Sequence, residues 1–560
     1  MKAGGLTLSR VAVLLFFLGL LVTGLFAFDD YGVSWDEQAN RSNGAISAIY
    51  VNEKFHHALL SEDEIHAKLT GIRRDADRYL PDAQKAARIP YTARTLLTPG
   101  VDRSYGVFFE LILIAVEALV GLSDSRSVYL MRHVCTFLLF YMSVVVFYRL
   151  TTRRFGHWTL GLIGCTVLIL SPVIFAHAFY NSKDLALLSM WIFATYSLLK
   201  LLDQWSIRHA VVHAFTSAAA IDIRVAGLAL PAITLSLFAV HLLTSPGRKA
   251  MLKQCVPGLL VYVALLPGLV MLFWPYLWEQ PVAHFREAVA TLSKVSWWDQ
   301  QVFYLGTFFN ATEVPRHYLP VWILISTPIS YSCCFLLGAL SFLAALLRNG
   351  LHSLYSDPHK RYDLVNVLLF FVPLCTMIVL KIGFFDGWRH AFFVYPAFVS
   401  IALLGLLAVV KPLTGAVHRM WRVPQAILLA GLLADLLHVG YFMIHNHPHQ
   451  HVYLNVLAGK DPRRTFELDY WGLSYRQGLE YLLRYDSSSV VKVNVANLPG
   501  ELNARILKPE QRHRLRFVPL NEATYFLSNF RSHPQDYEVG REWHAVTVDG
   551  MKILAVYKLR

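Results

Sequence analysis

The chain has 560 residues, of which 55% are hydrophobic and only 16% are charged, and its net charge is +13 at pH 7. Soluble domains carry about a quarter charged residues, so this composition excludes an ordinary soluble protein. The apolar residues recur in runs of about 17–25, the length that an α-helix needs to cross a bilayer. Lysine and arginine lie mostly in short clusters between these runs, which indicates membrane orientation rather than nucleic-acid binding. The sequence predicts an α-helical polytopic membrane protein.

The first apolar run covers residues 11–28 and follows Lys2 and Arg10. A positively charged end before an apolar run is typical of a signal peptide. Because many further runs follow, we expect an uncleaved signal-anchor that crosses from the inside to the outside. The chain after it, 29–105, is then the first external loop.

This loop opens on GVSWDEQ, residues 32–38. Asp36 and Glu37 would lie at the depth of the lipid head groups, where carboxylates cost free energy and often mark a site. We therefore interpret this pair as part of a site, and Asp29 and Asp30 as the solvated start of the loop. Residues 52–88 are charged and partly periodic, which predicts helices lying on the membrane surface.

Residues 106–122 are apolar but contain Glu110 and Glu117. A full crossing here would place Arg153 and Arg154 outside and reverse every later loop against the positive-inside rule. We expect a helix at the outer interface instead, with a crossing near 122–131 as the alternative.

The remaining spans follow from apolar length and from the side on which arginine and lysine gather. They are expected at 130–150, 158–176, 185–202, 209–221, 225–243, 256–274, 319–341, 363–381, 391–410 and 424–443. With the first run, about eleven transmembrane helices make up a membrane domain over residues 1–444.

Unusual polar residues gather at the external ends of these spans. Lys183 and Asp184 precede the fourth span, Asp222 and Arg224 lie in the next external turn, and Asp386, Arg389 and His390 precede the tenth. A ring of carboxylates and cations at one membrane face suits a phosphorylated lipid, since a cation binds the phosphate and a carboxylate takes a proton. A salt bridge or helix cap is the alternative for Lys183 and Asp184, and snorkelling to head groups is the alternative for Arg389.

The tail, 445–560, differs in composition and is predicted to be a small external α/β domain. An amphipathic helix is expected within 467–485. Asp549-Gly550 is a strong hairpin signal between the last two strands. The expected strands are 490–498, 514–520, 523–530, 541–548 and 551–559.

No metal site is predicted. The six cysteines lie in or beside the spans and show no zinc spacing, so they read as buried small hydrophobes. His445, His447, His449 and His451 cluster after the last span, but their alternate spacing around Pro448 favours an interfacial segment over a zinc site. SWWDQ, 296–300, resembles the WWD motif of the oligosaccharyltransferase catalytic subunit, but it lies in a loop between spans.

Several short motifs carry a resemblance to a known superfamily. They are Trp35-Asp36-Glu37, the acid Asp184 in NSKDLALLSMWIFATYSLLK, the arginine in DGWRHAFFVYP (386–396), ATEVPRHYLPVWILISTPI (311–329) and FELDYWGLSYR (466–476). This pattern resembles the GT-C membrane glycosyltransferases, in the branch of the protein O-mannosyltransferases and the aminoarabinose transferase ArnT.

The resemblance implies inverting transfer of a hexose or pentose from a polyprenyl-phosphate donor. Asp36 would be the base that activates the acceptor, with Glu37 its neighbour, and Asp184 would orient the acceptor or support the site. Arg389, with Lys183 or His390, would hold the donor phosphate. Lys183 beside Asp184 departs from the O-mannosyltransferase pattern and leaves the role of Asp184 open.

The expected location is the cytoplasmic membrane, with the site and the tail on the extracytoplasmic face. The partners would be the lipid-linked donor, membrane lipids and an acceptor that could be lipid A, a wall polysaccharide, a protein or another lipid. No cofactor is required by this scheme. One alternative is a metal-dependent glycan transferase in which Asp36, Glu37 and Asp184 bind a divalent cation, and another is a lipid-linked sugar transporter or flippase.

Overall fold

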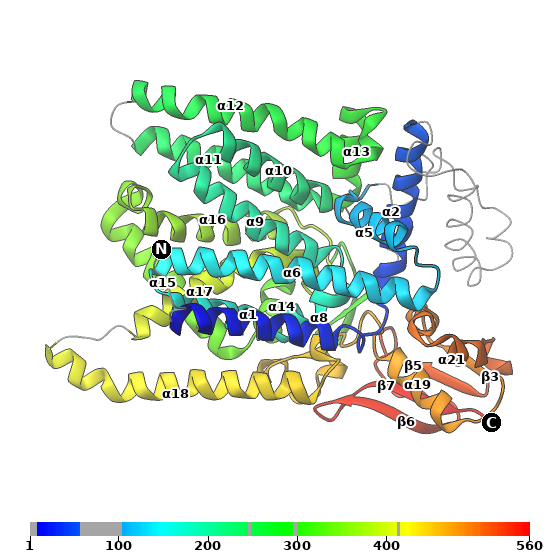
Figure 1. Cartoon of the computed structure of the whole chain (residues 1–560). Coiled ribbons are helices and arrows are strands. Elements are labelled where there is room, and N and C mark those ends of the chain that lie inside the picture. The colour runs from blue at the N-terminus through cyan, green and yellow to red at the C-terminus, as the bar shows by residue number, and fades with distance from the viewer. Residues whose placement is uncertain (1–7, 56–103, 245–247, 295–300, 411–414) are drawn as a thin grey trace.

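The computed structural model describes residues 8–55, 104–244, 248–294, 301–410 and 415–560. Long helices run side by side through most of the molecule, and strands β3 to β7 gather beyond one end of the bundle (Figure 1). The predicted class, a polytopic helical protein with a small C-terminal sheet domain, is confirmed.

Nine helices in the described part of the chain are long and apolar enough to cross a membrane. They are α1 (Leu8–Ala27), α6 (Ser125–Phe155), α9 (Asp184–Asp203), η2 with α11 (Val225–Leu228 and Ala229–Thr244), α12 (Arg248–Phe273), α15 (Ile329–Ser356), α16 (Pro358–Val379), η4 with α17 (Arg389–Val394 and Tyr395–Val410) and α18 (Gly415–His445). Each of them overlaps one of the eleven predicted spans.

The two other predicted spans are not among these nine helices. The run 158–176 forms α7 (Trp158–Ile169) and α8 (Pro172–Tyr180), which meet at an angle of 72°. Pro172 has no backbone N–H to continue the first helix, but it suits the first turn of the second. The run 209–221 lies in α10 (Ile207–Ile223), a helix of 17 residues.

The start predicted for the span 319–341 is wrong, because the spanning helix begins ten residues later. Residues Tyr318–Ser326 form a separate short helix, α14, and the spanning helix α15 starts only at Ile329. Thr327 is extended and Pro328 cannot donate a hydrogen bond to α14, so the helix ends before the proline. Gly350 interrupts α15 again near its other end with φ of 71°.

The predicted first external loop contains α2 (Trp35–Lys54), which packs against α5 (Phe108–Val120). The 13 residues of α5 reach about 20 Å, too short for a hydrocarbon core of about 30 Å. This length agrees with the interfacial helix predicted at 106–122. The predicted surface helices at 52–88 lie almost wholly outside the described residues.

The segment between α12 and α14 contains short elements that lie near α2 and the tail. They are η3 (Pro275–Trp278), α13 (Pro281–Lys294), β1 (Gln301–Tyr304) and β2 (Thr307–Asn310). The last two form an antiparallel hairpin. The SWWDQ sequence at 296–300 lies outside the described residues.

The tail contains all five predicted strands and the predicted helix. Its elements are η5 (Gln450–Val452), η6 (Val456–Ala458), η7 (Pro462–Arg464), α19 (Tyr475–Tyr485), β3 (Val491–Val495), α20 (Pro499–Leu502), η8 (Asn503–Ile506), α21 (Pro509–Arg514), β4 (Leu515–Phe517), η9 (Leu520–Glu522), β5 (Tyr525–Ser528), β6 (Arg541–Val548) and β7 (Met551–Lys558). The strand order is β4-β3-β5-β7-β6, with β3 parallel to both neighbours and β7 antiparallel to both of its own. Asp549 and Gly550 both have positive φ, as the predicted hairpin turn requires.

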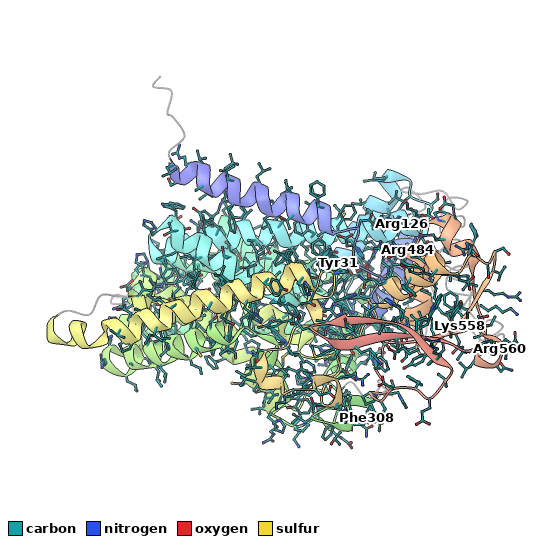
Figure 2. All side chains as sticks on the ribbon, turned by 90° about the horizontal axis from the view of Figure 1, so that it is seen from below. Tyr31, Arg126, Phe308, Arg484, Lys558 and Arg560 are labelled. Carbon is teal, nitrogen blue, oxygen red and sulfur yellow. The ribbon has the colours of Figure 1, made fainter. Side chains whose placement is uncertain are left out.

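The tail is closely joined to the membrane helices. Its first segment packs against α8 and α14. There the Asn455 side chain donates hydrogen bonds to the backbone oxygens of Leu324 and Thr327 at 2.7 Å. Figure 2 shows Tyr31, from the segment between α1 and α2, where the bundle meets the tail. The domain boundary at 444/445 stays a prediction.

Candidate active site

Asp36 and Glu37 lie together in the first turn of α2 but point to different surroundings. The Glu37 carboxylate accepts a hydrogen bond from the backbone N–H of Ser34 at 2.7 Å, which closes the start of the helix. Its other oxygen lies 3.1 Å from Nε2 of His133, and the side chain is 2% exposed. Asp36 is 30% exposed. Glu37 therefore anchors the helix, while Asp36 stays partly exposed.

Asp184 is the first residue of α9 and is buried. Asn181 shapes this helix start, because its side-chain oxygen accepts the Asp184 backbone N–H at 2.8 Å. The Asp184 carboxylate lies 2.5 Å from an Arg224 nitrogen and 3.2 Å from Nη1 of Arg389. Two guanidinium groups thus meet at one buried carboxylate.

Arg389, at the start of η4, is the centre of the cluster. Its guanidinium lies 3.1 Å from Asp36, 3.2 Å from Asp184 and 3.0 Å from Asp386. Only 2% of its side chain is exposed, so it does not snorkel toward lipid head groups. The aromatic rings of Phe385 and Trp471 lie 4.9 and 4.8 Å from the guanidinium carbon and enclose it further.

Asp386 connects this cluster to the tail. Its backbone has φ of 57°, a left-handed conformation that is uncommon outside glycine and often marks a functional site. Its carboxylate accepts hydrogen bonds from Trp471 Nε1 at 3.0 Å and from Arg531 Nη2 at 2.6 Å, in addition to those from Arg389. Two of its three partners therefore come from the tail.

Lys183 and His390 lie on the other side of Asp184 and Arg389. The Lys183 ammonium lies 3.0 Å from the centre of the Tyr105 ring, a close cation–π contact. His390 is half-buried, and its ring packs edge-on against Phe385 with centroids 4.7 Å apart. Neither side chain contributes to the three carboxylate contacts of Arg389.

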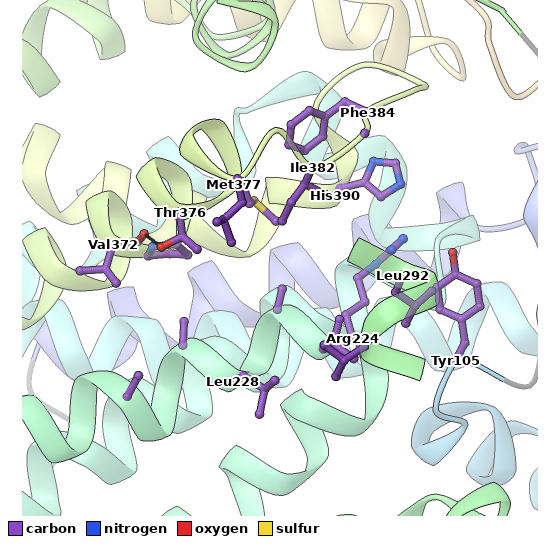
Figure 3. Close-up of a pocket in the computed structure, with 18 of the residues that line it drawn as sticks. Tyr105, Arg224, Leu228, Leu292, Val372, Thr376, Met377, Ile382, Phe384 and His390 are labelled. Atoms are coloured by element: carbon purple, nitrogen blue, oxygen red, sulfur yellow. Dashed lines mark hydrogen bonds between the residues drawn. The ribbon is translucent and has the colours of Figure 1, made fainter. Parts of the chain in front are cut away.

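A cavity of about 390 Å³ begins at this second side. Arg224, His390 and Tyr105 lie together at one end of it, and Val372 and Leu228 lie farther along (Figure 3). The walls are otherwise almost wholly apolar and come from η2, α11, α13, α16 and the loop after α16. They comprise Val225, Ala226, Leu228, Ala229, Ala232, Val289, Leu292, Val372, Pro373, Thr376, Met377, Leu380, Ile382, Gly383, Phe384 and Phe385.

The two acidic residues of α5 support the site from behind. Glu110 lies 2.5 Å from Arg132 of α6, and Glu117 lies 2.6 Å from Arg41 of α2. These buried pairs explain how an apolar helix tolerates two carboxylates, because each is neutralised by a neighbouring helix. The first of these pairs joins α5 to α6, and the second joins α5 to α2, which carries Asp36.

The carboxylates predicted as ligands in the metal-dependent alternative do not form an oxygen cage. Nη1 of Arg389 lies between Asp36 and Asp184, and Glu37 is turned toward His133. Across the ranges that the structure describes, no group of three His, Cys, Asp or Glu residues is arranged to hold a metal ion. These residues do not fit a divalent cation.

The histidines after the last span also have separate partners. His447 lies 2.9 Å from Asp30, His449 lies 3.0 Å from Gln477, and His451 lies 2.9 Å from Asp469. Burial lowers the pKa of His449 to about 4, so this ring is neutral at pH 7. The segment therefore joins the residues after α1 to the tail.

Glu467 is a buried carboxyl near Asp386 and Arg531. One oxygen accepts the backbone N–H of Phe303 at 3.2 Å, and the other has no hydrogen-bond partner in the described residues. The pKa of Glu467 is raised to about 7, mainly by burial; Arg531 opposes the shift and nearby Asp386 adds to it. This carboxyl therefore titrates near neutral pH.

Comparison with known proteins gives distant structural similarity alone. No model of a known protein family and no curated protein matches the chain. ArnT from Cupriavidus metallidurans in the apo state is 11% identical, covers 98% of both chains and gives a TM-score of 0.48. The same protein bound to undecaprenyl phosphate is 12% identical over 97% of both chains, with a TM-score of 0.45.

The apo oligosaccharyltransferase of Archaeoglobus fulgidus is 12% identical over 75% of this chain and 57% of its own, with a TM-score of 0.41.

The structure brings Asp36, Asp184 and Arg389 into direct contact and places Lys183 and His390 beside them. Sequence reasoning missed Arg531 and the role of Trp471. Trp471 lies in a motif that had been noted, but Arg531 is a single arginine after a strand, with no local signal that marks it.

Proposed function

We propose that the chain is a membrane glycosyltransferase of the GT-C type. It would transfer a sugar from a polyprenyl-phosphate donor to an acceptor on the extracytoplasmic face of the cytoplasmic membrane. The observation that carries the proposal is the apolar cavity between α11 and α16, whose cationic end lies against the Asp184–Arg389–Asp36 cluster.

The cavity suits the lipid part of such a donor. Its volume of about 390 Å³ and its apolar walls match a site that binds the first units of an isoprenoid chain. Arg224 lies at the polar end with Nε buried and without a hydrogen-bond partner in the described residues. A guanidinium in this position can bind a phosphate with two hydrogen bonds.

We therefore propose Arg224, with Lys183 and His390, as the group that holds the donor phosphate. Arg389 was predicted for this role from the sequence. Its guanidinium is already enclosed by three carboxylates and two rings, so we propose that it holds Asp36 and Asp184 in place. A substitution series at Arg389 separates the two roles.

Asp36 is proposed as the base. It is the exposed member of the carboxylate cluster, and it lies at the start of a helix held by a capping contact. The carboxylate accepts the proton of the acceptor hydroxyl while that oxygen forms a bond to the anomeric carbon of the sugar. The bond from this carbon to the phosphate oxygen breaks on the opposite face, which inverts the configuration and leaves polyprenyl phosphate.

The other two carboxylates support this step. Asp184 joins Arg224 at the phosphate to Arg389 at the base, so it fixes the distance between donor and acceptor. Glu37 keeps the first turn of α2 in place through Ser34 and His133. Neither residue needs to exchange a proton in the reaction.

The metal-dependent alternative is less well supported, because Arg389 supplies the positive charge between Asp36 and Asp184. A transporter is also less well supported, because the cluster lies at one end of the bundle, against the tail. Loss of transfer after chelation would favour the metal-dependent alternative over the proposal. A glycosylated product in envelope lipids or glycans would favour the proposal over a transporter.

The test is mass spectrometry of envelope glycolipids and glycans from a deletion strain beside the wild type. We expect one glycosylated product to disappear and to return with the wild-type gene. Identical envelope profiles in both strains would contradict the proposal.

A further inference from the structure

The first external loop is held by the tail through one buried asparagine. Asn503, which is fully buried at the start of η8, accepts the backbone N–H of Val33 at 3.0 Å through its side-chain oxygen. Its side-chain nitrogen lies 3.0 Å from the Val33 oxygen. The same nitrogen lies 2.9 Å from the oxygens of Gly472 and Pro499 in the tail. One amide thus joins the loop to two tail segments.

The loop and the tail are also in close steric contact here. A Cβ atom added at Gly32 would lie 2.2 Å from the Asn503 side-chain oxygen and 2.7 Å from the Leu473 backbone oxygen. Arg476, at the start of α19, donates to the Tyr31 oxygen at 2.8 Å. Ser34 and Asp36 follow directly, so the position of the tail sets where α2 begins.

A second tail residue reaches the cluster from the opposite side. Arg531 is buried, lies 2.6 Å from Asp386 and also donates to the Tyr470 oxygen. Its guanidinium lies 4.7 Å from the ring centre of Trp35, the residue before Asp36. Arg531 therefore contacts one residue next to each member of the Asp36–Arg389 ion pair. It contacts Asp386, the partner of Arg389, and Trp35, which precedes Asp36.

We propose that the tail completes the active site, with Asn503 and Arg531 as positioning residues that hold Asp36 and Arg389 in register. This rests on the proposed transfer reaction. Neither residue lines the cavity, so each acts through the backbone or side chain that it holds.

The tail also offers matched controls that belong to its own packing. Asn497 hydrogen-bonds Asn529 at 2.7 Å within the tail, and Arg463 pairs with Asp536 at 2.9 Å near its surface. If Asn503 and Arg531 only stabilised the tail, Asn497→Ala and Arg463→Ala would have similar effects on the membrane part.

The first experiment measures hydrogen exchange on the full-length protein in micelles, which needs no knowledge of the substrate. We expect Asn503→Ala to speed exchange about tenfold in residues 31–37, because two hydrogen bonds to that backbone are lost. Exchange in strand β5 should stay at its wild-type rate. Arg531→Ala should likewise speed exchange in residues 384–391. Unchanged exchange in these segments, or equal changes in the two controls, would overturn the proposal.

The second experiment measures turnover and donor-lipid binding. Misplacement of a catalytic group by about 1 Å costs on the order of 10²-fold in rate, so we expect turnover to fall by about that factor in Asn503→Ala and Arg531→Ala. Binding of undecaprenyl phosphate should stay unchanged, and Arg531→Lys should recover part of the rate. Wild-type turnover in both alanine variants, beside an inactive Asp36→Asn, would overturn the positioning role and leave the proposed function standing. No glycan product in any strain would overturn the proposed function, and the exchange data would still decide the positioning role.

Discussion

Replacing Arg389 by alanine tests the centre of the cluster. The change removes a buried cation that contacts three carboxylates, of which only Asp36 is partly exposed. Asp184 keeps Arg224 as a partner, and Asp386 keeps Arg531. Asp36 loses the one ion pair that it makes within the described residues.

The magnitude follows from this inventory. Breaking a buried ion pair costs about 3–5 kcal/mol, because the remaining charge is left without a partner. Since two of the three carboxylates keep another guanidinium, we expect Arg389→Ala to lower the free energy of unfolding by about 3 kcal/mol. Arg389→Lys keeps the charge but lacks the fork that reaches several carboxylates, so we expect about half of this loss.

Equilibrium unfolding in mixed micelles measures both variants. Arg463→Ala is the control, since its ion pair with half-exposed Asp536 should contribute no more than about 1 kcal/mol. The reasoning would be refuted if Arg389→Ala were as stable as the control. In turnover assays Arg389→Ala should lose more activity than Arg389→Lys. A selective loss of undecaprenyl phosphate binding in both variants would instead show that Arg389 binds the donor phosphate.

Four further outcomes are expected. Arg224→Ala should weaken binding of undecaprenyl phosphate at least tenfold, and Arg224→Lys should weaken it less, because a phosphate needs the positive charge first. Ala232→Trp should fill the cavity and weaken the same binding without changing the stability of the carboxylate cluster; unchanged affinity would show that the lipid lies elsewhere. Because the folded protein keeps a proton on Glu467 up to about pH 7, which the unfolded chain releases near pH 4.5, the free energy of unfolding should fall as pH rises through this window. Glu467→Gln should flatten that fall. Incubation with EDTA should leave transfer unchanged, and a loss restored by Mg²⁺ or Mn²⁺ would favour the metal-dependent alternative.

The helices were predictable because a membrane span needs a long apolar run, and such runs are visible without an alignment. The errors fall where proline interrupts a run. Pro172 bends the third span and Pro328 delays the start of α15, although the run of apolar residues continues across both. Both positions are preceded by serine or threonine, a local signal of a helix start that apolar length alone hides.

The cluster of charged residues was predictable where its members lie at the ends of spans. Asp36, Asp184 and Arg389 stand out there because charge is costly at the membrane interface. The tail partners were not predictable, since contacts across 470 residues, as between Val33 and Asn503, leave no periodic or local pattern. Arg531 meets Asp386 across 145 residues for the same reason.

The most direct test of the central claim is the turnover of Asp36→Asn. A positioned base contributes about 10²–10⁴-fold, so the account predicts a loss of at least about 100-fold in glycan product, with wild-type binding of undecaprenyl phosphate. Glu37→Gln should keep most of the activity, because its amide oxygen can still accept the Ser34 N–H. Near-normal turnover in a folded Asp36→Asn protein would contradict the account.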